Sequence, residues 1–386
     1  MIHKKNIELF VFIALSISPL IHASTESIEL SRTMWSCFMV ISIALITFFY
    51  SYQFRVHVFS STISRIAIAL SAALLLMQTY PIRPLALYYI LIAGALSYAI
   101  FHIYKSGHAQ KASYIVVILG CIALYSQWGI AQFIVQQDIG LVRIGESILS
   151  PNISGVASFY WEGQKFIRAY GPFAHANSFG GVVLLGIVLL FTHRKAFGSQ
   201  IFKQAMLCIL SLALLTSFSR AALLGWIYII TLWVWKNRSV ALIPAAIVII
   251  LFTPLLFFRS VDSHGVAVED RQTGVAWFMN MSSVQGVFRG LGVGNYSYAL
   301  QDFLNKNNIA HDPWDVAPVH SVPLLLIAEL GIGLTSLCIL TIYSFWRTHK
   351  PWPLLALVPA LVLDHYFATQ LAPLVFLIVS SLSVVQ

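Results

Sequence analysis

His320 is the side chain best placed in the sequence for proton transfer. It stands where a long polar segment gives way to an apolar run, just before Ser321, Val322 and Pro323. An imidazole can accept a proton at neutral pH, and the positive end of a following helix favours the uncharged ring. Ser321 is expected to cap that helix, with Pro323 in its first turn. Two interpretations stand: a general base, or a histidine that only caps a helix or hydrogen-bonds a loop.

Three arginines offer the complementary chemistry, which is anion binding. Arg220 follows two serines in a short turn between apolar runs, so its guanidinium and free helix N–H groups are expected to converge there. Contact with ordinary lipid headgroups is the alternative. Arg271 follows two acidic residues, and a solvated ion pair is its alternative. Arg289 precedes the glycine-rich run 290–296, which predicts a tight turn and not a dinucleotide fingerprint, because no strand precedes it.

The segment 168–177 holds two further candidates. Arg168 and His175 could contribute to an anion site, and a structural capping role is the alternative. Gly171 and the proline after it predict a turn, and Asn177 is expected to cap a helix that starts near residue 178. A metal is not expected, since the cluster of His311, Asp312 and Asp315 is of a kind common in loops without one.

The composition indicates a polytopic membrane protein. Of 386 residues, 59% are hydrophobic and 10% charged, against about 25% charged in soluble domains. The four cysteines lie in apolar runs and predict no disulfide framework. About twelve membrane helices are predicted, several of them near the roughly 20 residues that span a bilayer. The apolar runs are 7–23, 34–52, 63–80, 85–103, 113–135, 178–192, 200–216, 221–235, 240–258, 320–345, 353–364 and 371–386.

Charge predicts the orientation of these helices. With a cytoplasmic N-terminus, basic residues without acidic ones occupy the short inner loops, which is the positive-inside pattern. The net charge of +9 therefore does not indicate a nucleic-acid partner. Two long segments, 136–177 and 259–319, are expected outside, and no inner loop is large enough for a nucleotide-binding domain. The first 23 residues also have the outline of a signal peptide, and whether they are cleaved stays open.

These features divide the chain into five parts. The predicted parts are N-terminal transmembrane helices (1–135), a first external segment (136–177), central transmembrane helices (178–258), a large periplasmic loop (259–319) and C-terminal transmembrane helices (320–386).

The candidate residues fall into four short motifs. In chain order they are Arg168, Gly171, Phe173 and Asn177; Ser217 to Arg220; Arg271 with Trp277 and the run 290–296; and His320 with Ala328-Glu329-Leu330-Gly331. Taken in this order, the motifs resemble the O-antigen ligase and Wzy-type polymerase superfamily of bacterial glycan assembly. The resemblance covers the second half of the chain, and before residue 136 it rests on hydropathy alone.

The resemblance implies an all-α, GT-C-like membrane glycosyltransferase of the bacterial inner membrane, with its active site facing the periplasm. Its donor would be a glycan on undecaprenyl diphosphate and its acceptor a hydroxyl of lipid A-core or another glycan, with no cofactor and no required metal. By motif position, His320 corresponds to the base and Arg220 and Arg271 to the diphosphate ligands. Ser321 stands where ligases more often carry asparagine, so ligase and polymerase both stay open.

Two alternatives lie outside the ligase and polymerase pair. A protein O-oligosaccharyltransferase would use the same donor with a protein acceptor. A transporter of lipid-linked glycans would move the donor without forming a bond and would tolerate the loss of His320. Transfer chemistry is favoured, because a transporter would not require a base at this position.

Overall fold

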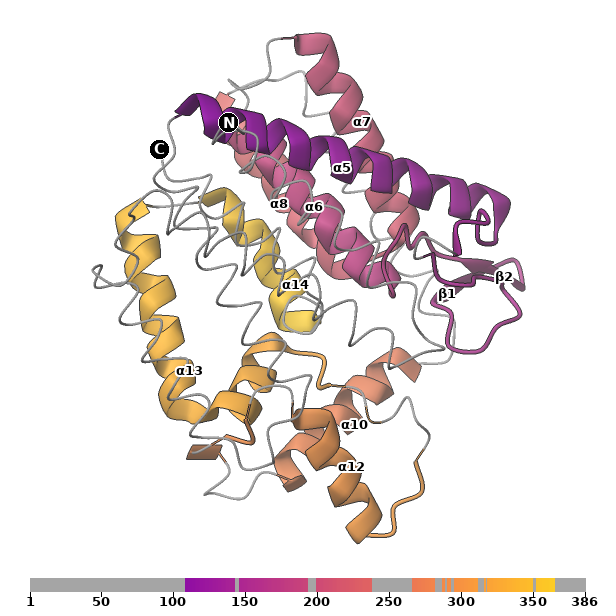
Figure 1. The fold of residues 1–386 in the computed structure, drawn as a ribbon, viewed down its shortest axis with the longest axis vertical. Coiled ribbons are helices and arrows are strands. Elements are labelled where there is room, and N and C mark those ends of the chain that lie inside the picture. The colour runs from indigo at the N-terminus through magenta and orange to yellow at the C-terminus, as the bar shows by residue number, and fades with distance from the viewer. Residues whose placement is uncertain are drawn as a thin grey trace, which may run out of the picture. The chain divides into compact units, whose positions relative to one another are not determined.

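A computed structural model of the chain describes residues 108–142, 146–193, 199–237, 266–281, 287–288, 290–292, 295–311, 316, 318–349 and 352–364. These residues belong to two compact units, one built from segments 106–268 and 351–386 and the other from 269–350. Figure 1 labels their helices and strands. The predicted runs 7–23, 34–52, 63–80, 85–103, 240–258 and 371–386 lie outside the described residues.

The first unit is mainly helical. Its elements are α5 (His108–Val135), β1 (Ser158–Trp161), β2 (Gln164–Ile167), α6 (Ala176–Thr192), α7 (Gln200–Ser217), α8 (Arg220–Asn237), the 3₁₀ helix η6 (Trp352–Leu357) and α14 (Val358–Leu363). The run predicted as one helix over 353–364 is thus a 3₁₀ helix followed by a short α-helix. A proline at the start of α14 suits this junction, because the first helical turn needs no backbone donor there.

The helical prediction is confirmed in its coarse form, since the described residues are mostly helical. The helices α5, α6, α7 and α8 coincide with four predicted runs. By length and composition, two described helices could cross a membrane, over Ile115–Val135 and Gln200–Ser217. The full set of about twelve membrane helices remains a prediction.

A two-stranded antiparallel sheet departs from the all-α prediction. Strands β1 and β2 pair with Ser158 opposite Ile167 and Trp161 opposite Gln164. The two residues between them, Glu162 and Gly163, both have positive φ, at 52° and 80°. Such a loop twists in the same sense as the strands it joins, so it favours a tight hairpin. The aromatic residues of β1 and this turn were the local signal for the sheet.

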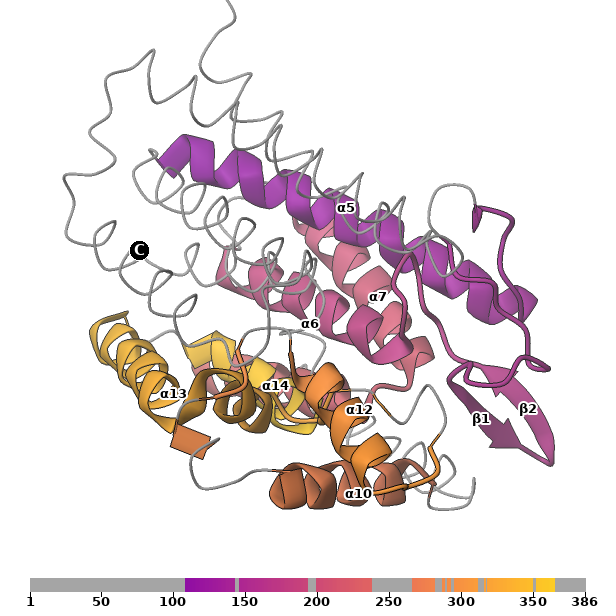
Figure 2. The ribbon, with the colours of Figure 1, turned by 60° about the horizontal axis from the view of Figure 1, so that its bottom comes forward.

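Helix α6 is the core of the first unit. Nearly every residue from Ala176 to Leu190 is buried, and α5, α7 and α8 pack around it (Figures 1 and 2). A helix that is apolar on all sides is stable only when other elements surround it. Gly225 on α8 permits a close approach to η6, because a β-carbon there would lie against the carbonyl of Ala356. The unit is therefore a helical bundle that segment 352–363 joins from far along the chain.

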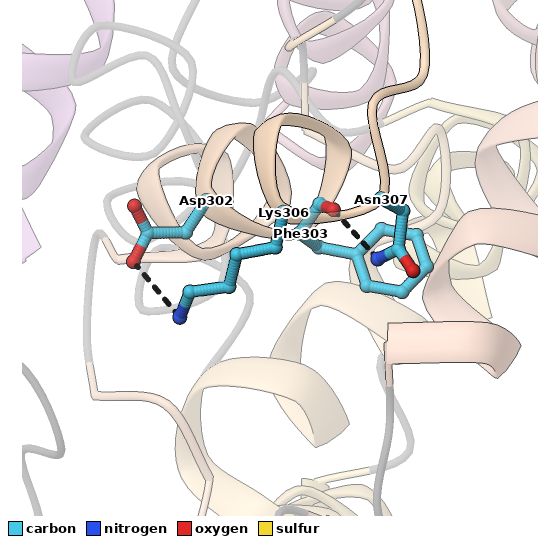
Figure 3. Close-up of polar contacts among 4 residues, drawn as sticks. All are labelled: Asp302, Phe303, Lys306 and Asn307. Atoms are coloured by element: carbon cyan, nitrogen blue, oxygen red, sulfur yellow. Dashed lines mark hydrogen bonds and ion pairs between the residues drawn. The ribbon is translucent and has the colours of Figure 1, made fainter.

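The second unit contains α12 (Tyr296–Lys306) and α13 (Val322–His349), while α10 (Val266–Met281) begins just before its boundary. Figure 3 shows the last turn of α12, where the Lys306 ammonium lies 3.9 Å from the Asp302 carboxylate and the Asn307 amide donates to the carbonyl of Phe303. Both charged side chains are exposed, so this ion pair adds little stability. The Asn307 bond closes the helix end.

Helix α13 breaks at Gly331, which has φ 74° and ψ 166°, a conformation almost confined to glycine. The break frees carbonyls that would otherwise bond within the helix. Two of them accept from the glycine-rich loop: Leu291 N–H donates to Ala328 (2.8 Å) and Gly292 N–H to Glu329 (2.9 Å). The backbone of the glycine-rich run therefore lies close to the backbone of α13. A close backbone approach is what the glycines predict. The continuous helix expected over 320–345 was wrong at this point, because the partners of the break lie about forty residues away.

Substitution of Gly290 by alanine is expected to destabilise the second unit. Gly290 has φ 76°, and a β-carbon there would lie 2.5 Å from the Gly331 nitrogen and nearer still to the Glu329 carbonyl oxygen. Backbone strain alone predicts a loss of roughly 1–3 kcal/mol. Thermal unfolding in lipid nanodiscs measures the change.

Gly274→Ala is the matched control. A β-carbon at Gly274, within α10, meets no atom within 4 Å, and alanine is the better helix former by about 1 kcal/mol. Equal melting temperatures for the Gly290 and Gly274 variants would contradict the close approach of the loop to α13.

Candidate functional site

Arg168 connects three segments of the first unit. Its Nε donates to the carbonyl of Ser217 at the end of α7 (2.7 Å), and its Nη2 donates to Oδ1 of Asn177 in α6 (2.5 Å). The Asn177 amide in turn donates to Oδ2 of Asp364, just after α14 (2.6 Å). Asp364 is buried, at 5% exposure. A buried carboxylate is thereby connected through one amide to a guanidinium, the arrangement that such a charge requires.

The turn between Arg168 and Asn177 is held in place by α5. Gly171 has φ 57°, as a turn there requires, and a β-carbon on it would lie within about 3 Å of the Phe179 ring. Both its N–H and its carbonyl bond the side chain of Gln132, at 2.8 and 3.1 Å. Phe173 is buried and packs edge-on against Tyr125. Each named position of this motif therefore has a structural task, and the predicted turn at Gly171 is confirmed.

His175 is the N-cap of α6. Its backbone is extended, and its Nδ1 accepts from the N–H of Asn177 at 3.1 Å. The prediction that Asn177 caps this helix was wrong: the helix starts at Ala176, so Asn177 already lies in the first turn. The amide of Asn177 is instead engaged by Arg168 and Asp364. Of the two interpretations of His175, the geometry supports capping.

Replacing His175 by alanine is expected to cost about 1 kcal/mol of stability, the usual effect of losing an N-cap. Asparagine at the same position should retain most of that stability, because its side-chain oxygen can accept the same N–H. Thermal unfolding of the two variants tests the assignment. If alanine and asparagine were equally destabilising, the imidazole would have a task other than capping.

The turn from α7 to α8 carries Arg220. Phe218 ends α7 in the left-handed region, with φ 48°, and its ring stacks on Phe159 of β1 with centroids 4.2 Å apart. Non-glycine residues keep this conformation where their surroundings hold them. Ser219 follows, and its carbonyl accepts from Leu223 N–H to open the helix. Arg220 is the first residue of α8 and is half-buried.

Two buried hydroxyls at the starts of α6 and α8 have no hydrogen-bond partner among the described residues. They are Oγ of Ser178, in the first turn of α6, and Oγ of Ser219, just before α8. Gly180 of α6 faces the turn so closely that a β-carbon on it would lie 2.6 Å from Cβ of Ser219 and 2.8 Å from Oγ of Ser217. The starts of α6 and α8 therefore lie side by side. Both present N–H groups that a helix cannot satisfy itself.

Sequence reasoning missed Glu146. Its carboxylate is 1% exposed and accepts four hydrogen bonds, from Trp128 Nε1, Gln132 Nε2 and the backbone N–H groups of Ile139 and Leu141, at 2.6 to 3.0 Å. A buried carboxylate needs this many donors. Glu146 therefore fixes the segment after α5 to that helix. No local pattern distinguishes it from the other acidic residues of 136–177.

His320 lies in the second unit, in a tight turn that precedes α13. The N–H of Ser321 donates to the carbonyl of Val319 at 2.7 Å, which bends the chain around His320. Ser321 stands directly before α13 and its carbonyl accepts from Leu325, while Pro323 lies in the first turn, both as predicted. His320 itself is half-buried and outside the helix. His320 thus stands two residues before the first residue of α13.

The remaining candidates are described only in part. Arg271 lies within α10, but its side chain is outside the described residues, as are Arg289, Asp312 and Asp315. Among the described residues no group of three histidines, cysteines or acids lies close enough to hold a metal ion.

The structure brings Arg168, His175 and Arg220 to the same end of the first unit, where α6 and α8 begin. His320 belongs to the second unit. Comparison with protein-family models, with curated proteins and with solved structures finds no match to this chain.

Proposed function

We propose that this chain is a bacterial inner-membrane glycosyltransferase that moves a glycan from undecaprenyl diphosphate to a hydroxyl of lipid A-core or another glycan on the periplasmic side. In this proposal the predicted helices, about twelve in number, span the membrane in a GT-C-like arrangement. His320 takes the proton of the acceptor hydroxyl, and Arg220 and Arg271 bind the donor diphosphate. No nucleotide or metal takes part.

The observation that supports the proposal is the position of Arg220. A fixed positive charge in the first turn of a helix opposes the helix dipole by about 0.3–1 kcal/mol, and the first turn of α8 contains no acidic residue. The N-terminal end of a helix favours a bound anion, and a guanidinium at the same place adds a second positive group. If α7 spans the bilayer, Arg220 lies three residues beyond its end, at the depth of a lipid diphosphate.

The chemistry needs these two residue types. A sugar hydroxyl is a poor nucleophile, and a positioned base accelerates its attack by roughly 10²–10⁴-fold. The lipid diphosphate leaves with growing negative charge, which guanidinium groups in a low-dielectric site stabilise. His320 at the start of α13 and Arg220 at the start of α8 supply these two tasks.

Glycan analysis of a deletion strain tests the reaction and its acceptor. Loss of a ligase is expected to leave long polymer on undecaprenyl diphosphate, whereas loss of a polymerase would leave single repeats on lipid A-core. Loss of glycan from proteins alone would indicate a protein O-oligosaccharyltransferase. If the strain keeps all of its glycans, the transferase proposal is wrong.

A further inference from the structure

A part-buried series of hydrogen bonds from Asp364 through Asn177 to Arg168 ends on the turn that carries Arg220. Arg168 holds the carbonyl of Ser217, and Ala169 N–H donates to the carbonyl of Thr216 at 3.0 Å. The last two carbonyls of α7 are therefore fixed by the segment that precedes α6. Arg220 comes only three residues later.

Among these three residues, only Asn177 both donates and accepts a hydrogen bond through its side chain. Its Oδ1 faces the guanidinium of Arg168 and its Nδ2 faces the carboxylate of Asp364. An aspartate at 177 would turn a second carboxylate toward Asp364, and like charges this close repel one another in a part-buried site. The residue at 364 therefore dictates which residue type can occupy 177, although 187 positions separate them.

We infer that Arg168, Asn177 and Asp364 form a positioning network that holds Arg220 in the orientation that binds the donor diphosphate. The inference rests on the proposed function and adds a specific task for three residues that need not touch the substrate. Through the carbonyl of Ser217, the network determines where α7 ends. The end of α7 determines where the first turn of α8 begins, and that turn places the guanidinium of Arg220.

The test exchanges the roles of two residues. Asn177→Asp places two carboxylates face to face and is expected to weaken binding of undecaprenyl diphosphate by about tenfold or more. Asp364→Asn keeps an acceptor toward Asn177 and loses only the charge, so a smaller weakening is expected. The double variant Asn177→Asp with Asp364→Asn restores the pattern, because the carboxylate introduced at position 177 accepts from both Arg168 and the new amide at 364. Its affinity should return to within about threefold of the parent.

The measurement is the dissociation constant of undecaprenyl diphosphate, made on the full-length chain in lipid nanodiscs. Thermal unfolding of each variant runs in parallel, so that affinity is compared only among folded proteins. Asn152→Asp is the matched control, because Asn152 is exposed in the same segment and the change introduces the same charge. Its affinity should equal that of the parent.

Each outcome either supports or overturns the positioning network. Recovery by the double variant supports the network, and a double variant as weak as Asn177→Asp overturns it. If Asn177→Asp does not fold, Asp364→Asn and the double variant are compared with the parent, and unchanged affinity in Asp364→Asn also overturns the inference.

Arg220→Ala distinguishes failure of the positioning network from failure of the proposed function. If that variant binds as tightly as the parent, the diphosphate assignment of Arg220 fails; if it binds weakly while folded network variants bind normally, only the positioning role fails.

Discussion

Replacing His320 by alanine is expected to lower glycan transfer by roughly 10²–10⁴-fold, the usual contribution of a general base. Binding of undecaprenyl diphosphate by the same variant should be unchanged, because the proposed task of the imidazole concerns the acceptor hydroxyl and not the donor. The two effects are measured on one preparation, as product formed from a lipid-linked glycan donor and as the dissociation constant of the lipid diphosphate.

His311→Ala provides the control for this experiment. His311 is a second histidine of the same unit, and its ring bonds the carbonyl of Ile309 in a local turn. Loss of that ring should leave transfer intact. Full transfer by the His320 variant would eliminate the base assignment. It would favour the helix-start role that the turn around His320 and Ser321 also allows.

Replacing Arg220 by alanine is expected to weaken both donor binding and transfer. Removal of one preorganised donor to a developing negative charge typically lowers the rate by about 10²–10³-fold. Arg220→Lys keeps the charge but loses the planar fork that matches phosphate, so it should recover only part of the loss. Donor affinity and transfer rate are measured for both variants.

Lys165→Ala is the control for charge. Lys165 lies on β2 of the first unit. Its replacement by alanine removes one positive charge, as Arg220→Ala does. If Lys165→Ala and Arg220→Ala weakened donor binding equally, the overall positive charge would explain the effect. A specific site at the start of α8 would then not be needed. A folded Arg220→Ala variant with full donor affinity would rule out this residue as a diphosphate ligand.

The glycine-rich run shows how a local pattern can predict a conformation but not its partner. Gly290 and Gly292 indicated a tight approach of backbone, and both have positive φ. Their partner, the broken turn of α13 at Gly331, was not predicted, because Gly331 lies within the run 320–345 that was predicted as one helix. The hairpin at Glu162 and Gly163 is the opposite case, since its two strands are neighbours in the chain, yet the all-α prediction missed it.

The sequence by itself determined α5, α6, α7 and α8, the turn at Gly171 and the start of α13 near Pro323, because apolar runs, glycine and proline act on their near neighbours through backbone geometry and burial. The helices α10 and α12 lie in the segment that the sequence predicted as a loop. Only the tertiary structure decided the tasks of Asn177, Glu146 and Asp364. Their partners lie up to 187 residues away. A buried polar group takes whichever donor the packing of the helices presents to it, and that choice depends on three-dimensional proximity that no local spacing encodes.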